Sequence, residues 1–138
     1  MTDTKTRLVT PRILWFAFLI SHATFVFIGW FIRSQGDIPP AGDELELFTL
    51  ILTGIGVVNA VASAVAVPMF MTKADFFTTL ILRFAFTEST TIFGVVLTFM
   101  GADLMWLYIL AAVGATAHIA AYPSEREFEA FERKREQG

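Results

Sequence analysis

Four long apolar stretches, separated by short polar ones, dominate the order of hydrophobic and polar residues along this chain. They run from about 13 to 32, 47 to 70, 76 to 100 and 104 to 122. Each contains about 19–25 residues, which at ~1.5 Å per residue spans the ~30 Å hydrocarbon core of a bilayer. Helices of a soluble bundle would instead show polar faces with a period of 3.6 residues. The pattern therefore predicts an all-α, polytopic integral membrane protein with four transmembrane helices.

The composition supports the same fold class. Of the 138 residues, 55% are hydrophobic, the mean hydropathy is +0.62, and 15 residues are Phe. A soluble domain of this length has too much surface for its volume to bury so many apolar side chains. We expect a single membrane domain over 1–122 and a short charged cytoplasmic tail over 123–138. The tail reads "SEREFEAFERKRE" from Ser124, and both a short helix and a solvated extension fit it.

The basic residues predict the orientation, because cytoplasmic segments of membrane proteins carry an excess of Lys and Arg. With four spans, the other side of the membrane carries only Arg33, among acidic residues. Trp15 and Trp30 bracket the first span, and Trp106 and Tyr122 bracket the fourth, as interfacial aromatic belts do. We expect both termini in the cytoplasm and the protein in a bacterial inner membrane. The residues on the predicted cytoplasmic side are Lys5, Arg7, Arg12, Lys73, Arg126, Arg133, Lys134 and Arg135.

One carboxylate interrupts the third span, in the stretch "RFAFTESTTIFGVVLTF" that begins at Arg83. Glu88 lies about 12 residues into the span, so ~18 Å deep and near the bilayer midplane. An ionised carboxylate at that depth costs several kcal/mol and must be protonated, paired or bound to a cation. Arg83 is not the expected partner, because five residues along a helix place the two side chains about 140° apart. Its long side chain can extend to the lipid headgroups instead.

Two interpretations of Glu88 stay open. In the first, the carboxylate and neighbouring hydroxyl groups form an ion site, since hard oxygen ligands suit a proton or an alkali cation better than a soft metal. In the alternative, the chain is a non-transporting structural or accessory protein. There a protonated Glu88 only fixes helix packing through a hydrogen bond, and the hydroxyls bond back to their own helix. The hydroxyl residues are Thr87, Ser89, Thr90 and Thr91.

The second span supplies small residues and an amide. Gly56, Ala60 and Ala64 follow a small-xxx-small spacing and, with Gly54, predict a close helix-packing face. Asn59 lies near mid-depth on the neighbouring face. The short turn over 71–75 folds the third span back, so Asn59 and Glu88 reach similar depths. The predicted ion-binding residues are therefore Glu88, Ser89, Asn59 and Thr87.

A small-residue helix containing "GIG", a short turn and a helix reading "FTESTTIFGVVLTF" together resemble the c subunit, or proteolipid, of rotary ATPases. The resemblance covers about 50–100. In that family a carboxylate-bearing hairpin assembles in many copies into an ion-carrying ring. The resemblance implies a central c-subunit-like hairpin, a homo-oligomeric ring or bundle, and Glu88 as the ion-carrying carboxylate. An acid followed by Ser, with an amide on the first helix, is similar to the sodium-binding variants, which implies Asn59 and Ser89 in the site.

The remaining chemistry is sparse. His22 and His118 could ligate a haem between two helices, but counting from the span ends places them ~14 Å and ~6 Å deep, so we expect no haem. We predict no metal site and no catalytic residues, because the sequence contains no phosphate-binding loop, nucleophile elbow or metalloprotease helix. We expect no nucleic-acid partner, because the sequence has no basic patch outside the short tail. The expected partners are the lipid bilayer, copies of the chain and a larger membrane complex.

Overall fold

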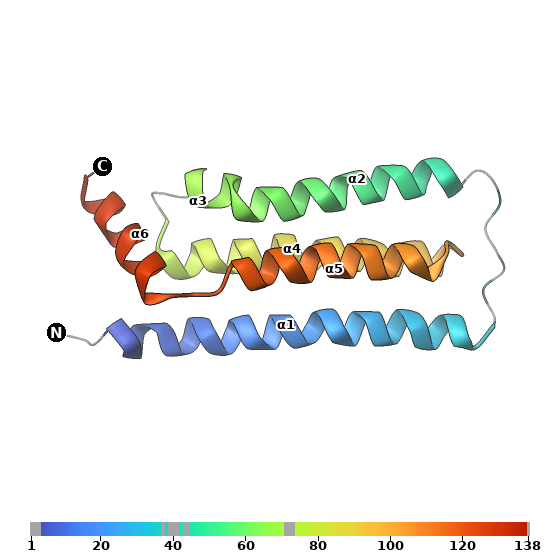
Figure 1. The fold of residues 1–138 in the computed structure, drawn as a ribbon, viewed down its shortest axis with the longest axis horizontal. Helices are drawn as coiled ribbons and strands as arrows, with labels where there is room; N and C mark the ends of the chain where they lie inside the picture. The colour runs from blue at the N-terminus through green and yellow to red at the C-terminus, as the bar shows by residue number, and fades with distance from the viewer. Residues whose placement is uncertain (1–3, 37, 39–41, 43–44, 71–73, 138) are drawn as a thin grey trace.

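The computed structural model describes residues 4–36, 38, 42, 45–70 and 74–137, and this part of the chain is built from helices without strands. The four long helices lie side by side, and each runs antiparallel to the long helix before it (Figure 1). The prediction of an all-α fold is confirmed. The helices are α1 (Thr4–Ser34), α2 (Leu45–Ala64), α3 (Ala66–Phe70), α4 (Phe76–Phe99), α5 (Leu104–Ala120) and α6 (Glu125–Gln137).

Three of these helices, α1, α2 and α4, are each long and apolar enough to cross a membrane. Helix α5 has 17 residues, and it meets the same criterion only together with α6, from which it is bent by 69°. The described part of the chain thus contains three to four candidate spans. This number is compatible with an integral membrane protein.

Two predicted boundaries differ from the structure. The second apolar stretch is broken at Val65, where α2 ends and the short α3 begins. Pro68 accounts for the break, because it has no N–H to donate and its ring clashes with the carbonyl of Ala64, four residues earlier. Helix α1 begins at Thr4, well before the apolar stretch, and its early residue Leu8 is fully buried in an apolar cluster that includes Phe128 of α6.

The first and last helices meet at one end of the bundle. The first turns of α1 and the whole of α6 lie there, together with α3 and the start of α4 (Figure 1). The tail is thus helical from Glu125 onward, the first of the two forms left open above. Lys73, most of the turn over 71–75 and most of the loop over 36–44 lie outside the described residues.

Helices α4 and α5 form the centre of the bundle, since they pack against each other and each also packs against α1 and α2. At the α6 end the α4 residues Phe76, Leu80 and Phe84 join one buried apolar cluster, and at the other end Leu97 joins a second. Between the two clusters the buried side chains of α4 are three threonines, Thr87, Thr90 and Thr91, and then Val95. The middle of the core is therefore more polar than either cluster.

The start of α4 is set by Asp75. Its carboxylate accepts hydrogen bonds from the Thr78 backbone N–H, at 2.8 Å, and from the Thr78 hydroxyl, at 2.7 Å. These two bonds, the backbone one first, hold the pKa of Asp75 below its ordinary value of 3.8. The cap therefore stabilises α4 at every pH above that value, and its contribution is lost as the pH falls through the lower folded-state pKa.

We expect Asp75→Ala to lower the free energy of unfolding by about 1 kcal/mol, the usual cost of losing an N-cap. Asp75→Asn should retain most of the stability, because Asn caps helices about as well as Asp, but should remove the acid dependence. Unfolding in detergent micelles at neutral and acidic pH, followed by circular dichroism, measures both. A loss of the same size in Asp75→Asn and Asp75→Ala at neutral pH would contradict the capping role.

Candidate functional site

The candidate site is a layer of polar side chains in the middle of the bundle, between the two apolar clusters. Four helices supply it, α1, α2, α4 and α5. Its members are hydrogen-bonded across helices, as buried polar groups need to be. The buried members are His22, Thr87, Thr90, Thr91 and His118, and the partly buried ones are Ser21, Asn59, Glu88 and Ser89.

Glu88 lies in the seam between α4 and α1. Its Oε1 is hydrogen-bonded to the hydroxyl of Ser21 on α1. The same hydroxyl also lies 2.7 Å from the backbone carbonyl of Phe18, one turn earlier on α1. Ser21 was not predicted as a site residue, because a single serine in the first apolar stretch carries no signal until the partner helix is known.

The structure does not bring the side chains of Asn59 and Glu88 together. The amide of Asn59 on α2 donates instead to the Ser89 hydroxyl, at 2.8 Å. Glu88 and Ser89 are consecutive on α4, so their side chains point about 100° apart and meet different helices. The predicted ion-binding set therefore divides between the α1–α4 seam and the α2–α4 seam.

Thr87, the fourth predicted ligand, faces a third direction. Its hydroxyl lies 3.1 Å from His118 Nδ1 on α5 and 2.8 Å from the carbonyl of Phe84. On the α2 side, the Thr90 hydroxyl donates to the backbone carbonyl of Gly56, at 2.9 Å. The hydroxyls around Glu88 thus connect α4 with each of its neighbours and do not converge on one point.

The expectation that His22 and His118 lie at different depths is wrong. Their ring centroids are 5.3 Å apart in an edge-to-face contact. The depths were counted from the ends of the apolar stretches, but α5 stops beside Trp15, whose indole N–H donates to the His118 carbonyl at 2.9 Å. Helix α1 continues about three turns beyond that point. Because the rings touch, haem ligation by this pair would require them to separate.

Arg83 has a partner that the sequence did not indicate. It is 6% exposed, and its guanidinium is ion-paired with Glu127 of α6 while its Nε donates to the carbonyl of Ser63 on α2, at 3.1 Å. The expectation that its side chain extends outward is therefore wrong: α6 folds over the end of α4 and brings a carboxylate to it. As predicted, Arg83 does not bind Glu88.

The small residues of α2 also divide between two faces. Gly56 and Ala60 are buried, and a Cβ on Gly56 would lie 2.9 Å from Leu110 of α5. Gly54 points the opposite way, with nothing within 4 Å of where its Cβ would be, and Ala64 is exposed. Two residues along a helix turn the direction by about 200°, so Gly54 cannot share the face of Gly56.

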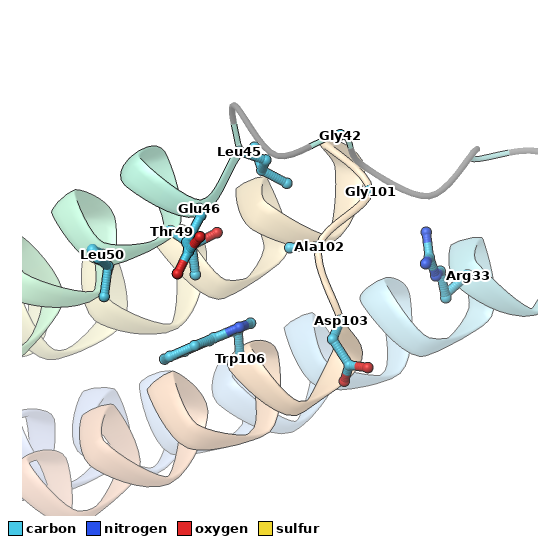
Figure 2. Close-up of a pocket in the computed structure, with 10 residues that line it drawn as sticks. All are labelled: Arg33, Gly42, Leu45, Glu46, Thr49, Leu50, Gly101, Ala102, Asp103 and Trp106. Atoms are coloured by element: carbon cyan, nitrogen blue, oxygen red, sulfur yellow. The ribbon is translucent and has the colours of Figure 1, made fainter.

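A pocket of about 410 Å³ lies at the end of the bundle away from α6 (Figure 2). Arg33 of α1, Glu46 of α2 and Trp106 of α5 border it, and Arg33 stands apart from the other two across the opening (Figure 2). None of the residues around it belongs to the polar layer. The chemistry predicted for Glu88 therefore has to be sought in the polar layer and not in this pocket.

Metal binding finds no support in the described residues, which contain no group of three or more His, Asp or Glu side chains placed to hold an ion. No family model, curated protein or solved structure matches this chain. The likeness of about 50–100 to rotary ATPase c subunits consequently rests on the sequence pattern alone.

Proposed function

We propose that this chain is an integral membrane protein with four spans and both termini in the cytoplasm, of a bacterial inner membrane, and that it binds a proton at Glu88. The four long helices support the spans. The orientation is supported by the basic residues at the end where α1 begins and α6 lies (Figure 1), against Arg33 at the other end. Those basic residues include Arg7, Arg12, Arg126, Arg133, Lys134 and Arg135.

The observation that carries the proposal is the position of the Ser21 hydroxyl between two acceptors. A hydroxyl has one hydrogen to donate and can also accept. When Glu88 is ionised, Ser21 donates to its carboxylate. When Glu88 is protonated, it donates to the Ser21 oxygen, and Ser21 donates to the Phe18 carbonyl at 2.7 Å. Both protonation states are hydrogen-bonded, so a proton can bind or leave with only a rotation of one hydroxyl.

The same geometry favours a proton over sodium. A carboxyl binds a proton by itself, whereas an alkali cation needs several oxygen ligands converging on one point. Asn59 and Ser89 bind each other at 2.8 Å, and Thr87 faces His118. Among the described side chains, the one hydrogen-bonded to Glu88 is Ser21. A sodium site would require the α1–α4 and α2–α4 seams to rearrange together.

A homo-oligomeric assembly remains part of the proposal, on the likeness to c subunits. In such a ring the carboxylate meets a neighbouring protein. Here α1 of the same chain already contacts Glu88 through Ser21, while Glu88 stays partly exposed. We therefore propose that Glu88 exchanges its proton along the α1–α4 seam of one four-helix unit.

A second candidate function is structural. If the Ser21 hydrogen always points to the Phe18 carbonyl, the contact with Glu88 needs a permanently protonated carboxyl that ties α4 to α1. The short Ser21–Phe18 distance of 2.7 Å favours this alternative. The two candidates differ in a single property, which is whether the carboxyl of Glu88 ever loses its proton.

Carbodiimide labelling separates the candidates, because the reagent attacks a protonated carboxyl in an apolar setting. We expect labelling of the full-length protein in detergent to fade as the pH is raised and to be unaffected by sodium. Glu88→Gln should not be labelled. Ser21→Ala should keep its labelling to higher pH, because the ionised carboxylate loses its donor.

Labelling that stays constant over the whole pH range in which the protein remains folded would overturn the proton-binding proposal and leave the structural candidate. Slower labelling in the presence of sodium would mean that the site binds a sodium ion and would contradict a site for protons alone. Absence of labelling throughout would mean a carboxyl sealed within the packing, which also contradicts exchange. The Glu88→Gln variant checks that the label reports this residue.

A further inference from the structure

A second hydroxyl lies between two acceptors in the polar layer, next to His118. The Thr87 hydroxyl is 2.8 Å from the Phe84 carbonyl and 3.1 Å from His118 Nδ1. It has one hydrogen, so it cannot donate to both at once. Either Thr87 donates to His118, or His118 carries a hydrogen on Nδ1 and donates to Thr87.

The other nitrogen of His118 is fixed by the backbone. His118 Nε2 lies 2.9 Å from the carbonyl of Trp15, which can only accept. Nε2 must therefore carry a hydrogen in every protonation state. In the neutral ring Nδ1 accepts from Thr87. In the charged ring Nδ1 donates to Thr87, and Thr87 turns its hydrogen to the Phe84 carbonyl. Both states leave every polar atom of this group bonded.

His22 does not have this property. Its Nδ1 lies 2.6 Å from the Thr91 hydroxyl, but its Nε2 is buried without a partner. A charged His22 would leave a buried N–H unpaired, which costs more than an unpaired lone pair on a neutral ring. The centroids of the two rings are 5.3 Å apart, so two charges would also repel each other strongly.

We propose that the His22–His118 pair is a second proton-binding site, which takes up a single proton on His118 with Thr87 as its hydrogen-bond switch. His22 is its neutral neighbour. The charged groups facing His118 are Glu88 and Arg83 of α4, and Arg83 is itself paired with Glu127 of α6. This site goes beyond the one proposed at Glu88 and does not need Glu88 to titrate.

The two sites share the same two helices. Ser21 and His22 are consecutive on α1, and Thr87 and Glu88 are consecutive on α4. A proton on His118 stabilises an ionised Glu88 by Coulomb attraction, and the reverse holds equally. Proton release at Glu88 therefore favours proton uptake at His118, so the two proton-binding sites have coupled occupancy.

The ¹⁵N NMR signals of histidine test this assignment, because they distinguish the imidazolium ion and both neutral tautomers. The full-length protein, ¹⁵N-labelled at histidine and held in lipid bilayers, is titrated from about pH 8 to pH 4.5. His22→Gln and His118→Gln assign the two residues. We expect the Nε2–H tautomer for neutral His118, its conversion to imidazolium as the pH falls, and no charge on His22.

Thr87→Val keeps the shape of the side chain and removes the switch. The charged ring then loses the acceptor for Nδ1–H, so we expect about tenfold less imidazolium relative to neutral His118 at a given pH. Thr87→Ser retains the hydroxyl, so His118 should titrate in it as in the native protein. This variant tests the switch even if Thr87→Val folds poorly. Thr116→Val on the exposed face of α5, where the hydroxyl bonds only to its own helix at Ala112, should have no effect.

The inference is overturned if His118 stays neutral throughout, if His22 becomes charged first, or if Thr87→Val and Thr116→Val titrate alike. The result is independent of carbodiimide labelling. A titrating His118 beside a Glu88 that labels at every pH would uphold the histidine site and overturn the function proposed for Glu88. A His118 that stays neutral beside a Glu88 whose labelling changes with pH would overturn the histidine site and uphold the function proposed for Glu88. In Glu88→Gln, we expect His118 to bind its proton more weakly, since the attracting carboxylate is gone.

Discussion

Replacing Glu127 with alanine is expected to release helix α6 from the bundle. Glu127 is the ion-pair partner of Arg83, whose side chain is 7% exposed. Removing one member of a buried pair leaves the other charge without compensation, which costs ~3–5 kcal/mol when both are buried. Because the Glu127 side chain is 34% exposed, we expect a smaller loss here, of about 1–3 kcal/mol. The free-energy cost of the unpaired guanidinium of Arg83 is smallest if α6 detaches, because water can then solvate it.

Trypsin measures this release, because α6 contains Arg126, Arg133, Lys134 and Arg135 and a detached helix is cleaved faster. Glu129→Ala is a matched control on the same helix. Glu129 pairs with Arg133 at 3.9 Å, and both side chains are mostly exposed, so its loss should change the stability by ~0.5 kcal/mol or less.

The charge itself can be tested in a double-mutant cycle. In an Arg83→Met background no buried cation is left behind, so Glu127→Ala should then have little effect. Equal cleavage rates for the native protein and Glu127→Ala would contradict the role of the ion pair. An undiminished effect of Glu127→Ala in the Arg83→Met background would show that α6 is held by other contacts.

The second large effect is expected at Gly114 of α5, whose Cα lies close to residues of α4 and α1 in the polar layer. A Cβ at this position would lie 2.7 Å from the backbone carbonyl of Thr87, 2.8 Å from the Thr91 hydroxyl and 3.2 Å from His22 Cε1. The backbone atom cannot move away without shifting α4. We therefore expect Gly114→Ala to lower the free energy of unfolding by about 1–3 kcal/mol, as overpacking does.

Gly54→Ala provides the matched control, because it makes the same substitution in a helix where nothing lies within 4 Å of the new Cβ. Alanine favours the helix over glycine by ~1 kcal/mol, so Gly54→Ala should be neutral or stabilising. Thermal unfolding in detergent, followed by circular dichroism, compares the two variants. Equal stability changes would contradict the close approach of α5 to α4.

The apolar pattern predicted most of this fold, because the position and length of each helix depend on local sequence. Helix α4 was expected over 76–100 and is found at Phe76–Phe99. Its polar middle could be seen in the sequence as well, since Glu88 and the threonines interrupt an otherwise apolar stretch. The separation of Arg83 from Glu88 followed from helical geometry alone. The break at Val65 could have been predicted, because Pro68 is a known helix breaker.

The partners of these residues could not be predicted, because they depend on how far each helix is shifted along its neighbours. Periodicity gives the direction of a side chain but not the level of the residue that meets it. The contact of His22 with His118 depends on α5 ending beside Trp15, and the pairing of Arg83 with Glu127 depends on the bend that follows α5. The role of Ser21 becomes apparent only from the packing of α1 against α4, which brings its hydroxyl to Glu88.

The central claim is that Glu88 binds and releases a proton, and infrared spectroscopy of the full-length protein in lipid bilayers tests it most directly. A protonated carboxyl buried in an apolar setting has its own C=O stretching band, and this band should be absent in Glu88→Gln. We predict that the Glu88 band disappears as the pH is raised and returns as it is lowered, with its position shifted in Ser21→Ala. A Glu88 band that keeps its full intensity over the whole pH range in which the protein remains folded would contradict the account, because the carboxyl would then serve only to hold α4 against α1.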